Sequence, residues 1–420
     1  MNPDKKVEVN INSEIGELEA VIIHTPGPEV ENMTPKSAER ALYSDILNLS
    51  EAEKEYNQFK KILQMHTRTF EVKDLLGEIL CSENVKNALL AKVCKNENAF
   101  CTDADSTDIS DQELAGQLIE GVELKKNTLT NYLSSDRYSL QPLHNFFFTR
   151  DASSAINDFV LINKMANIVR EREALIMEAI FNYHPLLQAK TFNPVNEVDT
   201  DSKISIEGGD IQIARKDTLL LGNSIRTSTQ GIDYILSKVK KENKIKNVIV
   251  QELPATSESF IHLDMTFTFL SQNEVMIYEP VILNPSHYKT IHIEIDNGKV
   301  KIRESQNILQ VLKDINYEVE PVYCGGKTDN WIQEREQWHS GANFFALAPG
   351  KILGYGRNNY TLEEMNKHGY EILPAEEIIN GKADYKNYKK YVITIDSSEL
   401  SRGGGGCRCM TMPVSRKDLT

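Results

Sequence analysis

Short apolar runs separated by polar turns recur along most of the chain. The first run, 18–24, is aliphatic and breaks at the turn residues of 25–28, which is the pattern of a buried strand followed by a turn. Later copies consist of an apolar strand, a polar turn, a second apolar strand and often a helix, and they cover 145–183, 206–239, 260–281 and 343–368. Their irregular spacing excludes a solenoid of fixed period.

A hairpin-plus-helix unit of this kind cannot bury both of its faces alone. Five units, counting the opening segment as a degenerate copy, are therefore expected to close around a common axis, which also removes exposed strand edges. A doubly wound sheet is the competing arrangement, but it needs single strands that alternate with helices. The predicted fold class is α/β, with repeated hairpin units in a closed array.

Two helices are predicted after the first strand, over 36–47 and 50–66. Apolar residues recur at helical spacing in the second helix, and Ser50 with Glu53 has the spacing of a capping box at its start. Both helices belong to the part of the chain that contains the first strand.

The pattern changes between 73 and 140. Segments 85–93 and 111–119 have helical patterns, and no strand-like run separates them. We therefore predict an all-helical insertion, 73–140, in an α/β catalytic domain that is formed by 1–72 and 141–420.

Charge and cysteine content narrow the partners and the compartment. The chain has 61 acidic and 47 basic residues and a formal net charge of −14, which argues against nucleic acid or an anionic membrane as a partner. No run of about 18 apolar residues occurs, and the first residues lack the apolar segment of a secretory signal. The 6 cysteines do not form a disulfide framework, so reduced thiols of a cytoplasmic protein are expected.

The segment 401–413 carries the strongest single signal for chemistry. Four consecutive glycines, 403–406, give a backbone that can approach a ligand closely, and Cys409 follows them. Arg402 and Arg408 lie near this cysteine in sequence, so an electropositive setting that favours the nucleophilic thiolate is expected. The alternative is a flexible tail with incidental cysteines.

Three further polar groups stand at the ends of predicted strands. Glu207 and Asp210 bracket a Gly-Gly turn, His262 and Asp264 open an apolar strand on one face, and Asp151 ends a strand that begins near 145. Each group alone has a simpler explanation, as solvated acids of a turn or as a structural histidine. At equivalent ends of the hairpin units, however, all of them would converge with the cysteine on the axis.

Such a site would suit a planar guanidinium group. Carboxylates bind its N–H donors through paired charge-assisted hydrogen bonds. Its carbon is a poor electrophile, which calls for a strong nucleophile such as a thiolate, and a histidine can protonate a departing amine near neutral pH.

Six segments, taken in order, resemble the arginine deiminases: EIGELEAVIIHTPGPEVENMTP, NFFFTRD, IEGGDIQIARKDTLLLGNSIRTSTQGI, HLDMTFTF, EREQWHSGANFFALAPGKILGY and GGGGCRCMTMPVSRKDL. EGGD and HLD alone also belong to the wider guanidine-modifying, or pentein, superfamily. The resemblance spans nearly the whole chain and implies a five-bladed α/β propeller of ββαβ-type units, with pseudo-fivefold symmetry and a helical insertion. It also implies hydrolysis of L-arginine to L-citrulline and ammonia through a covalent thiouronium intermediate.

The resemblance assigns catalytic roles residue by residue. Cys409 is similar to the family's nucleophile and His262 to its general acid and base. Asp151 and Asp264 resemble the carboxylates that hold the guanidinium, and Glu207 the carboxylate that orients the histidine and contacts the substrate.

A substrate-binding set follows from the same resemblance. Arg170 and Arg226 resemble the pair that binds the α-carboxylate, Asn145 and Phe148 resemble pocket-lining residues, and Asp210 and Arg402 complete the set. No metal or organic cofactor is implied. The family resemblance also implies a homo-oligomer, either a dimer or a tetramer.

The sequence leaves other substrates and reactions open. Agmatine, methylated arginine or citrulline could be the substrate of a related hydrolase, and an amidinotransferase is a further alternative. Arg170 and Arg226 favour an amino acid over agmatine, which has no α-carboxylate. A catalytically inactive arginine-binding protein is the alternative from another class.

Cys407 departs from the family pattern, because relatives often carry proline at this position. The substitution is either simply tolerated or provides a second thiol that makes the activity sensitive to oxidation.

Overall fold

The computed structural model describes residues 5–35, 45–97, 109–197, 203–255, 257–283 and 288–419. The helix predicted over 36–47 lies outside this set except for 45–47, which are not helical. Among the described helices, none combines the length and the apolar character that crossing a membrane requires.

The described strands form six sheets, and five of them share one pattern. An antiparallel pair makes up two strands of each of these sheets. Four of the pairs are hairpins: β5 (Ser153–Ile156) with β6 (Phe159–Ile162), β8 (Ile211–Arg215) with β9 (Thr218–Asn223), β11 (Phe267–Phe269) with β12 (Glu274–Ile277), and β16 (Phe345–Ala348) with β17 (Lys351–Tyr355). In the fifth unit, β20 (Met412–Arg416) and β1 (Leu18–Ile23) pair in the same way but come from opposite ends of the chain; the unit is counted with the hairpins below.

A third strand joins each hairpin in parallel. These strands are β7 (Lys190–Phe192), β10 (Asn247–Glu252), β15 (Glu320–Tyr323), β19 (Tyr391–Ile395) and β2 (Arg68–Glu71). Beyond them, β13 (Thr290–Asp296) and β14 (Lys299–Ser305) extend the sheet of β10, and β18 (Glu371–Pro374) lies beside β19. The predicted hairpin repeat is confirmed, and each of the described sheets is open.

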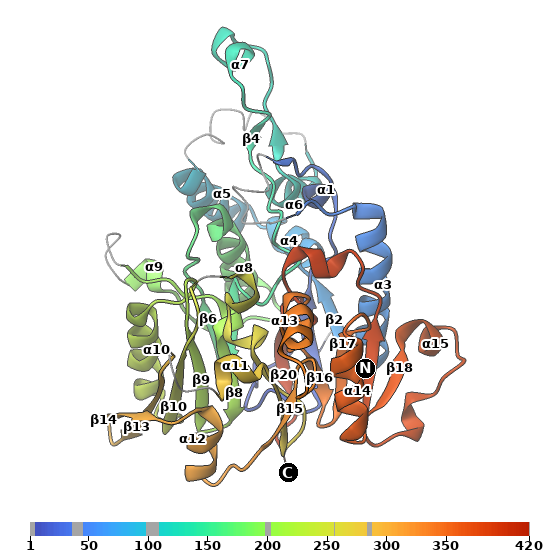
Figure 1. The fold of residues 1–420 in the computed structure, drawn as a ribbon. Coiled ribbons are helices and arrows are strands. Elements are labelled where there is room, and N and C mark those ends of the chain that lie inside the picture. The colour runs from blue at the N-terminus through green and yellow to red at the C-terminus, as the bar shows by residue number, and fades with distance from the viewer. Residues whose placement is uncertain are drawn as a thin grey trace.

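Helices make the crossovers that parallel pairing requires. The crossover segments contain α1 (Pro28–Glu31) and α3 (Leu49–His66), α8 (Glu171–Tyr183), α10 (Thr229–Glu242), α11 (Glu279–Ile282) and α12 (Ile308–Asp314), and α14 (Asn359–Lys367) and α15 (Ala375–Ile379). In Figure 1, α3 and α10 lie on opposite outer sides of the strands. The predicted helix 50–66 is confirmed as α3, but its N-cap is Asn48, whose side chain accepts from the Ser50 N–H (3.1 Å), so the predicted capping box is wrong.

The remaining described elements are short. They are α9 (Pro194–Glu197), α13 (Asn330–Trp338), and the 3-10 turns η2 (Ile168–Arg170), η3 (Gly208–Asp210), η4 (Glu258–Phe260), η5 (Leu263–Met265), η6 (Tyr385–Asn387) and η7 (Leu400–Gly403).

The segment 73–140 lies at one end of the molecule and carries α7 at the tip of a projecting arm (Figure 1). Its helices are α4 (Val72–Leu80), α5 (Glu83–Glu97), α6 (Asp111–Glu120) and α7 (Leu129–Leu133). It also contains a two-stranded antiparallel ribbon, β3 (Val122–Glu123) with β4 (Tyr138–Leu140), so the expectation of an all-helical segment is wrong. The buried apolar residues of α4, α5 and α6 share one cluster with β5, β6 and α8, so these helices have no separate core.

Two predicted strands prove to be turns. Residues 145–151 form successive turns, and the strand starts only at Ser153. Asp264 belongs to the 3-10 turn η5, His262 is its N-cap, and β11 starts at Phe267. Both segments are apolar enough to resemble strands, but their backbone N–H groups donate to carbonyls three residues earlier and so form turns.

The cysteines also differ from expectation. Cys81, Cys324, Cys407 and Cys409 are free thiols, whereas Cys94 is disulfide-bonded, so the expectation of reduced thiols is wrong at that position.

Candidate active site

A short polar turn precedes each of the five hairpins. Asp151 lies before β5, Asp210 before β8, Asp264 before β11, Asn343 before β16 and Cys409 before β20. Because the five sheets share one strand pattern, these residues occupy equivalent places in their units. Candidate residues from four of the five units were recognisable in the sequence, and Asn343 was missed.

Hydrogen bonds join each of these turns to the next and the last turn to the first. The donors and acceptors are Gly208 N–H to the Asp151 carbonyl (3.2 Å), Leu263 N–H to the Asp210 carboxylate (2.8 Å), Asn343 Nδ2 to the Asp264 carbonyl (3.0 Å), Arg408 N–H to Asn343 Oδ1 (2.9 Å) and Arg150 N–H to the Cys409 carbonyl (3.1 Å). The predicted meeting of distant residues in one place is therefore confirmed for these turns.

Cys409 is buried among carboxylate and amide groups. Its Sγ lies 3.8 and 3.9 Å from the two oxygens of Asp264, and Asn343 Nδ2 approaches it to 3.2 Å. Burial, followed by the negative charges of Asp264 and Asp151, raises the pKa of the thiol well above its ordinary value. The Cys409 sulfur is therefore a neutral thiol in the free protein.

The predicted electropositive setting of Cys409 is wrong. Arg408 is turned to carboxylates, with Nη1 2.7 Å from Asp264 and a bidentate pair to Glu14 at 3.1 Å. Arg402 faces solvent and pairs with Asp45 (2.7 Å) and with Glu399 (3.0 Å). The positive charges near this cysteine in sequence are thus neutralised elsewhere.

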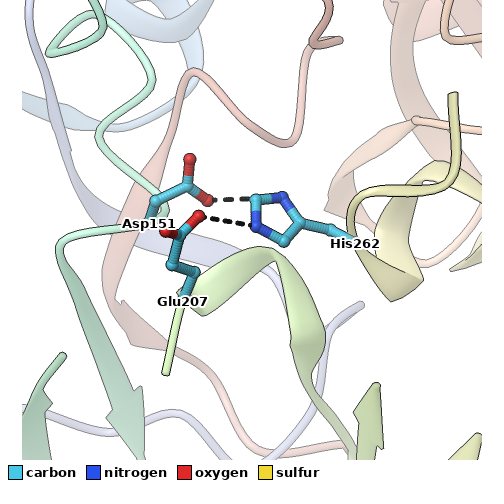
Figure 2. A group of neighbouring side chains, drawn as sticks. All are labelled: Asp151, Glu207 and His262. Atoms are coloured by element: carbon cyan, nitrogen blue, oxygen red, sulfur yellow. Dashed lines mark hydrogen bonds and ion pairs between the residues drawn. The ribbon is translucent and has the colours of Figure 1, made fainter. Parts of the chain in front are cut away.

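His262 faces two carboxylates, Asp151 and Glu207, which lie on the same side of its ring in Figure 2. Its Nε2 is 2.9 Å from Glu207 Oε2, and its Nδ1 is 3.7 Å from Asp151 Oδ1. Burial lowers the pKa of this imidazole, but the charge of Asp151, the hydrogen bond to Glu207 and the charge of Asp210 together raise it to about 9. His262 is therefore protonated at neutral pH and able to donate a proton.

Glu207 is fully buried at the centre of a group of cations. Burial opposes its ionised form, but Arg226, His262 and Arg170 lower its pKa well below the ordinary range. Arg226 Nη1 lies 3.5 Å from Oε1 and Arg170 Nη1 lies 3.8 Å from Oε2. Glu207 is accordingly a permanent negative charge that holds His262 in its imidazolium form.

Arg170 and Arg226 differ in how far protein groups use their donors. Arg170 is buried, its Nε and Nη2 bind Glu173 at 3.0 and 2.8 Å, and its Nη1 binds Asp151 at 2.8 Å. Arg226 is partly exposed and has the long contact to Glu207. Of the two predicted carboxylate binders, Arg226 has the more available guanidinium.

Asp210 faces the protein rather than an open space. One oxygen accepts the Leu263 N–H at 2.8 Å and the other accepts the Ser224 hydroxyl at 2.6 Å. Burial raises its pKa to about 7 despite His262 and these donors. One oxygen thus supports the turn that carries His262 and the other binds Ser224 after β9, while a direct role of Asp210 in substrate binding stays a prediction.

Asn145 and Phe148 lie in the turns that lead to Asp151, and the Phe148 N–H donates to the Asn145 carbonyl at 3.0 Å. The Phe148 ring lies against Gly403 and Gly405, where a side chain would clash with it. The absence of side chains in the glycine run thus lets the loop before the cysteine pack on Phe148.

Arg402, which the sequence placed in the substrate-binding set, lies away from the side chains around Cys409 and His262. It lines a surface cavity of about 150 Å³ together with Met265, the residue after Asp264. Its charge reaches Asp45 and Glu399 rather than the thiol.

Asp151, Glu207 and His262 have the spacing of a metal site, with candidate ligand atoms within 4.8 Å of one another. Cations already accompany these carboxylates, because Arg170 and Arg226 lie beside them and the imidazole is protonated. A protonated imidazole is not a metal ligand. The donor set fits a proton-transfer network better than a metal centre.

Cys407 is fully buried in the apolar cluster that also contains Phe147 and Phe148. Burial raises the pKa of its thiol far above the ordinary value. Since thiolate character governs oxidation, this environment disfavours a redox role.

Four important residues escaped the sequence interpretation: Glu14, Glu173, Asn343 and Arg408 as an ion-pair partner. Asn343 had a usable signal, since it precedes an apolar hairpin as the other site residues do. Glu14 and Glu173 had none, because an acid in a loop or on a helix has the same sequence pattern when it is exposed.

Three solved structures align with nearly the whole chain. The first is SxtG, an amidinotransferase from Microseira wollei (TM-score 0.54, 12% identity, covering 98% of each chain). The second is an adduct of a dimethylarginine dimethylaminohydrolase with S-methyl-L-thiocitrulline (TM-score 0.51, 14% identity, covering 94% of this chain and 99% of the other). The third is the N-terminal domain of ArgZ covalently bound to a reaction intermediate (TM-score 0.53, 12% identity, covering 96% of this chain and 99% of the other). At these identities the likeness concerns the fold alone. It shows that the chain has the mixed α/β fold of these pentein-fold proteins.

Sequence comparison narrows this class to one family. The arginine deiminase family model matches residues 39–416. The chain is 34% identical to an arginine deiminase of Bacillus thuringiensis subsp. konkukian over 99% of its own length and 100% of that relative. It is 33% identical to an arginine deiminase of Listeria monocytogenes serotype 4a over 98% of each. This chain belongs to the arginine deiminase family.

Proposed function

We propose that this protein hydrolyses L-arginine to L-citrulline and ammonia, as an enzyme that cleaves a guanidino C–N bond. One observation carries the proposal: a buried thiol lies 3.8 Å from Asp264, while Asp151 acts electrostatically on both Cys409 and the protonated His262. Membership of the arginine deiminase family supports the same reaction.

The substrate guanidinium binds between Asp151 and Asp264. Asp151 Oδ1 is buried and has no hydrogen-bond donor among the described residues, although it faces the His262 ring. A planar cation with several N–H donors satisfies such an oxygen, and it also offsets the negative charge that the two aspartates share.

The α-carboxylate of the substrate binds first to Arg226. This guanidinium is partly exposed and makes a 3.5 Å contact with Glu207, so a carboxylate can approach its other donors. Arg170 contributes once the arriving guanidinium competes for Asp151, which now holds Arg170 Nη1 at 2.8 Å. Agmatine lacks the group that Arg226 recognises.

The bound cation also activates the nucleophile. Burial, together with the carboxylates of Asp264 and Asp151, keeps the Cys409 thiol neutral in the free protein, and a guanidinium placed between these carboxylates offsets their negative charge. The thiol then releases its proton to solvent, and the thiolate attacks the guanidinium carbon to form a C–S bond.

His262 supplies and recovers the proton of the reaction. As imidazolium it protonates the departing nitrogen, so the C–N bond breaks, ammonia leaves and a cationic thiouronium remains on the sulfur. Neutral His262 then takes a proton from water, and the resulting hydroxide attacks the thiouronium carbon. Collapse breaks the C–S bond, regenerates the thiolate, and releases citrulline and one proton, which the ammonia accepts.

Asn343, Asp210 and Arg402 act around this chemistry. Asn343 stabilises the thiolate through its Nδ2 and is a positioning residue for the loop of Cys409. Asp210 positions the His262 turn, and Arg402 acts at the entrance cavity beside Met265.

The five units close around a common axis as a five-bladed propeller. The support is the cyclic set of hydrogen bonds between the polar turns, together with contacts of β1 with β16 and of β20 with β5. The catalytic domain comprises 1–72 and 141–420, with 73–140 inserted. Self-association as a dimer or tetramer and a cytoplasmic location stay predictions.

The decisive experiment incubates purified protein with L-arginine and quantifies citrulline and ammonia. Agmatine and citrulline serve as alternative substrates, and equal turnover of agmatine would contradict recognition through Arg226. Arg226→Leu is expected to raise KM for L-arginine about 10- to 100-fold, the effect of losing a charge-assisted hydrogen bond. Failure to form citrulline from arginine would reject the proposed function.

A further inference from the structure

A small internal cavity lies next to the polar turns but outside the set of groups used for the reaction. It measures about 10 Å³, and its walls come from β5, β8 and β20 and from the chain around Glu14. A space of this size holds a single water-sized or halide-sized particle. Carboxylate and phosphate ligands are too large for it.

The charges around this cavity do not balance. Arg150, Arg408 and Arg416 are buried, and they face the carboxylates of Glu14 and Asp264. Arg408 takes up both carboxylates, with Glu14 at 3.1 Å and Asp264 at 2.7 Å. One positive charge is therefore left over among side chains that are at most 7% exposed.

Arg150 and Arg416 have no ion-pair partner in the described part of the chain. Arg150 donates to the Arg408 carbonyl (3.2 Å) and to Thr411 Oγ1 (2.9 Å), and Arg416 Nη1 donates to the Gly16 carbonyl (2.7 Å). Each of these acceptors is neutral. A buried charge without a counter-charge is costly, and burial accordingly lowers the pKa of Arg150 to about 9 and that of Arg416 to about 10.

Two buried donors at the cavity are also unsatisfied. Arg416 Nη2 and Ser153 Oγ have no hydrogen-bond partner among the described residues, and both residues line the cavity. Arg416 is 1% exposed and Ser153 is not exposed at all, so bulk water does not compensate either atom. Native proteins rarely leave such donors unpaired.

We propose that this cavity binds one chloride ion, held by Arg150, Arg416 and the Ser153 hydroxyl. A halide accepts hydrogen bonds from both unsatisfied donors and also neutralises the excess positive charge. A water molecule would accept the hydrogen bonds but would not neutralise the charge. Arg408 links this cavity to the active site, because its guanidinium pairs with Glu14 on the cavity wall and with Asp264 beside Cys409. The inference concerns this cavity alone and stands whether or not the proposed reaction is correct.

Crystals of the full chain grown in sodium bromide test the site directly. A peak in the bromine anomalous map within contact of Arg416 and Ser153 is expected. A cavity that contains water and no anomalous peak would overturn the proposal.

Thermal unfolding supplies the solution test. At constant ionic strength, replacing gluconate with bromide should raise the Tm by about 2 °C and the rise should saturate, as expected when a ligand binds only the folded state. A bromide peak in crystals without this saturable rise would mean an adventitious ion only, and would also overturn the proposal.

Two variants make the solution test specific. Arg416→Met should abolish the bromide-dependent rise, and Arg335→Met, at an exposed position on α13, should leave it unchanged as the matched control. If Arg416→Met does not fold, Ser153→Ala keeps all charges and should raise the half-saturating bromide concentration several-fold. An unaltered bromide response in Ser153→Ala together with Arg416→Met would reject the site.

Discussion

The two sides of the active site balance charge in opposite ways. Around His262, the carboxylates of Asp151 and Glu207 are matched by Arg170 and Arg226, and the imidazole stays protonated, with a pKa of about 9. Around Cys409, burial and then the charges of Asp264 and Asp151 raise the pKa of the thiol, and the adjacent guanidinium groups point elsewhere. The acid is therefore ready in the free protein, whereas the nucleophile is not.

This difference has a consequence for selectivity. In the proposed mechanism the Cys409 thiol ionises only when a cation lies between Asp151 and Asp264, so the free protein is expected to react slowly with neutral electrophiles and oxidants. The same guanidinium that must be cleaved thus activates the group that attacks it. Neutral citrulline, which has the same shape, cannot provide the charge.

The largest effect is expected from removing the nucleophile. Cys409→Ser should reduce kcat by at least about 10⁴-fold, because a buried serine hydroxyl does not ionise and no base is placed to activate it. Arginine binding, measured by calorimetry, should persist, since the carboxylates and Arg226 remain. A serine variant with near-normal turnover would refute covalent thiol catalysis.

Replacing the acid tests the other side of the comparison. His262→Ala should lower kcat by about 10²- to 10⁴-fold, the range of general acid–base catalysis. Because His262 also activates the water, some thiouronium adduct on Cys409 should be trapped and visible by intact-protein mass spectrometry. An unchanged kcat would show that another group handles the proton.

A titration compares both sides in one protein. The raised pKa of His262, a cationic acid, means that it is charged below about pH 9, so its NMR signals should titrate near 9. The raised pKa of Cys409, a neutral acid, means that thiolate absorbance should be absent at pH 7 and appear only at alkaline pH. Cys409→Ser identifies the absorbance. Thiolate at neutral pH without ligand would contradict the proposed activation by substrate.

Asn343 sharpens the comparison on the thiol side. Removing its N–H donor, which lies 3.2 Å from the sulfur, should cost about 10-fold in kcat, the value of a hydrogen bond to a charged group. Asn343→Asp is the matched variant, because it keeps the acceptor for the Arg408 N–H but lacks the donor. Asn343→Asp should move the pH midpoint of Cys409 alkylation upward, which a purely structural role would not do.

Much of this architecture was predictable because apolar patterning is a strong local signal. The hairpins, the long helix 50–66 and the convergence of the polar groups follow from alternation and from the need to bury both faces of each unit. The turns at 145–151 and at His262 were mistaken for strands, because their apolar residues are buried as strand residues are.

The charges of the site were less predictable, since they depend on which partners a side chain reaches in three dimensions. Arg402 and Arg408 lie close to Cys409 in sequence, yet their guanidinium groups bind Asp45, Glu399, Glu14 and Asp264. Sequence proximity indicated positive charge at the thiol, and the folded chain has the reverse. Pairing of this kind has no period and no local motif.

The smallest effect is expected at Cys407. This residue lies close to Cys409 in the sequence, but we do not expect it to take part in the reaction. Cys407 is fully buried in an apolar cluster and its thiol pKa is far above the ordinary value, so it does not share the carboxylate environment of Cys409. Cys407→Ala should change kcat less than about 2-fold and leave the rate of inactivation by peroxide unchanged. Alanine is the right replacement, because a serine hydroxyl would be buried without a partner. If loss of Cys407 instead slowed the recovery of activity when peroxide-treated protein is reduced with dithiothreitol, the thiol would have a resolving role, and its distance from the carboxylates would not be what sets the two buried cysteines apart.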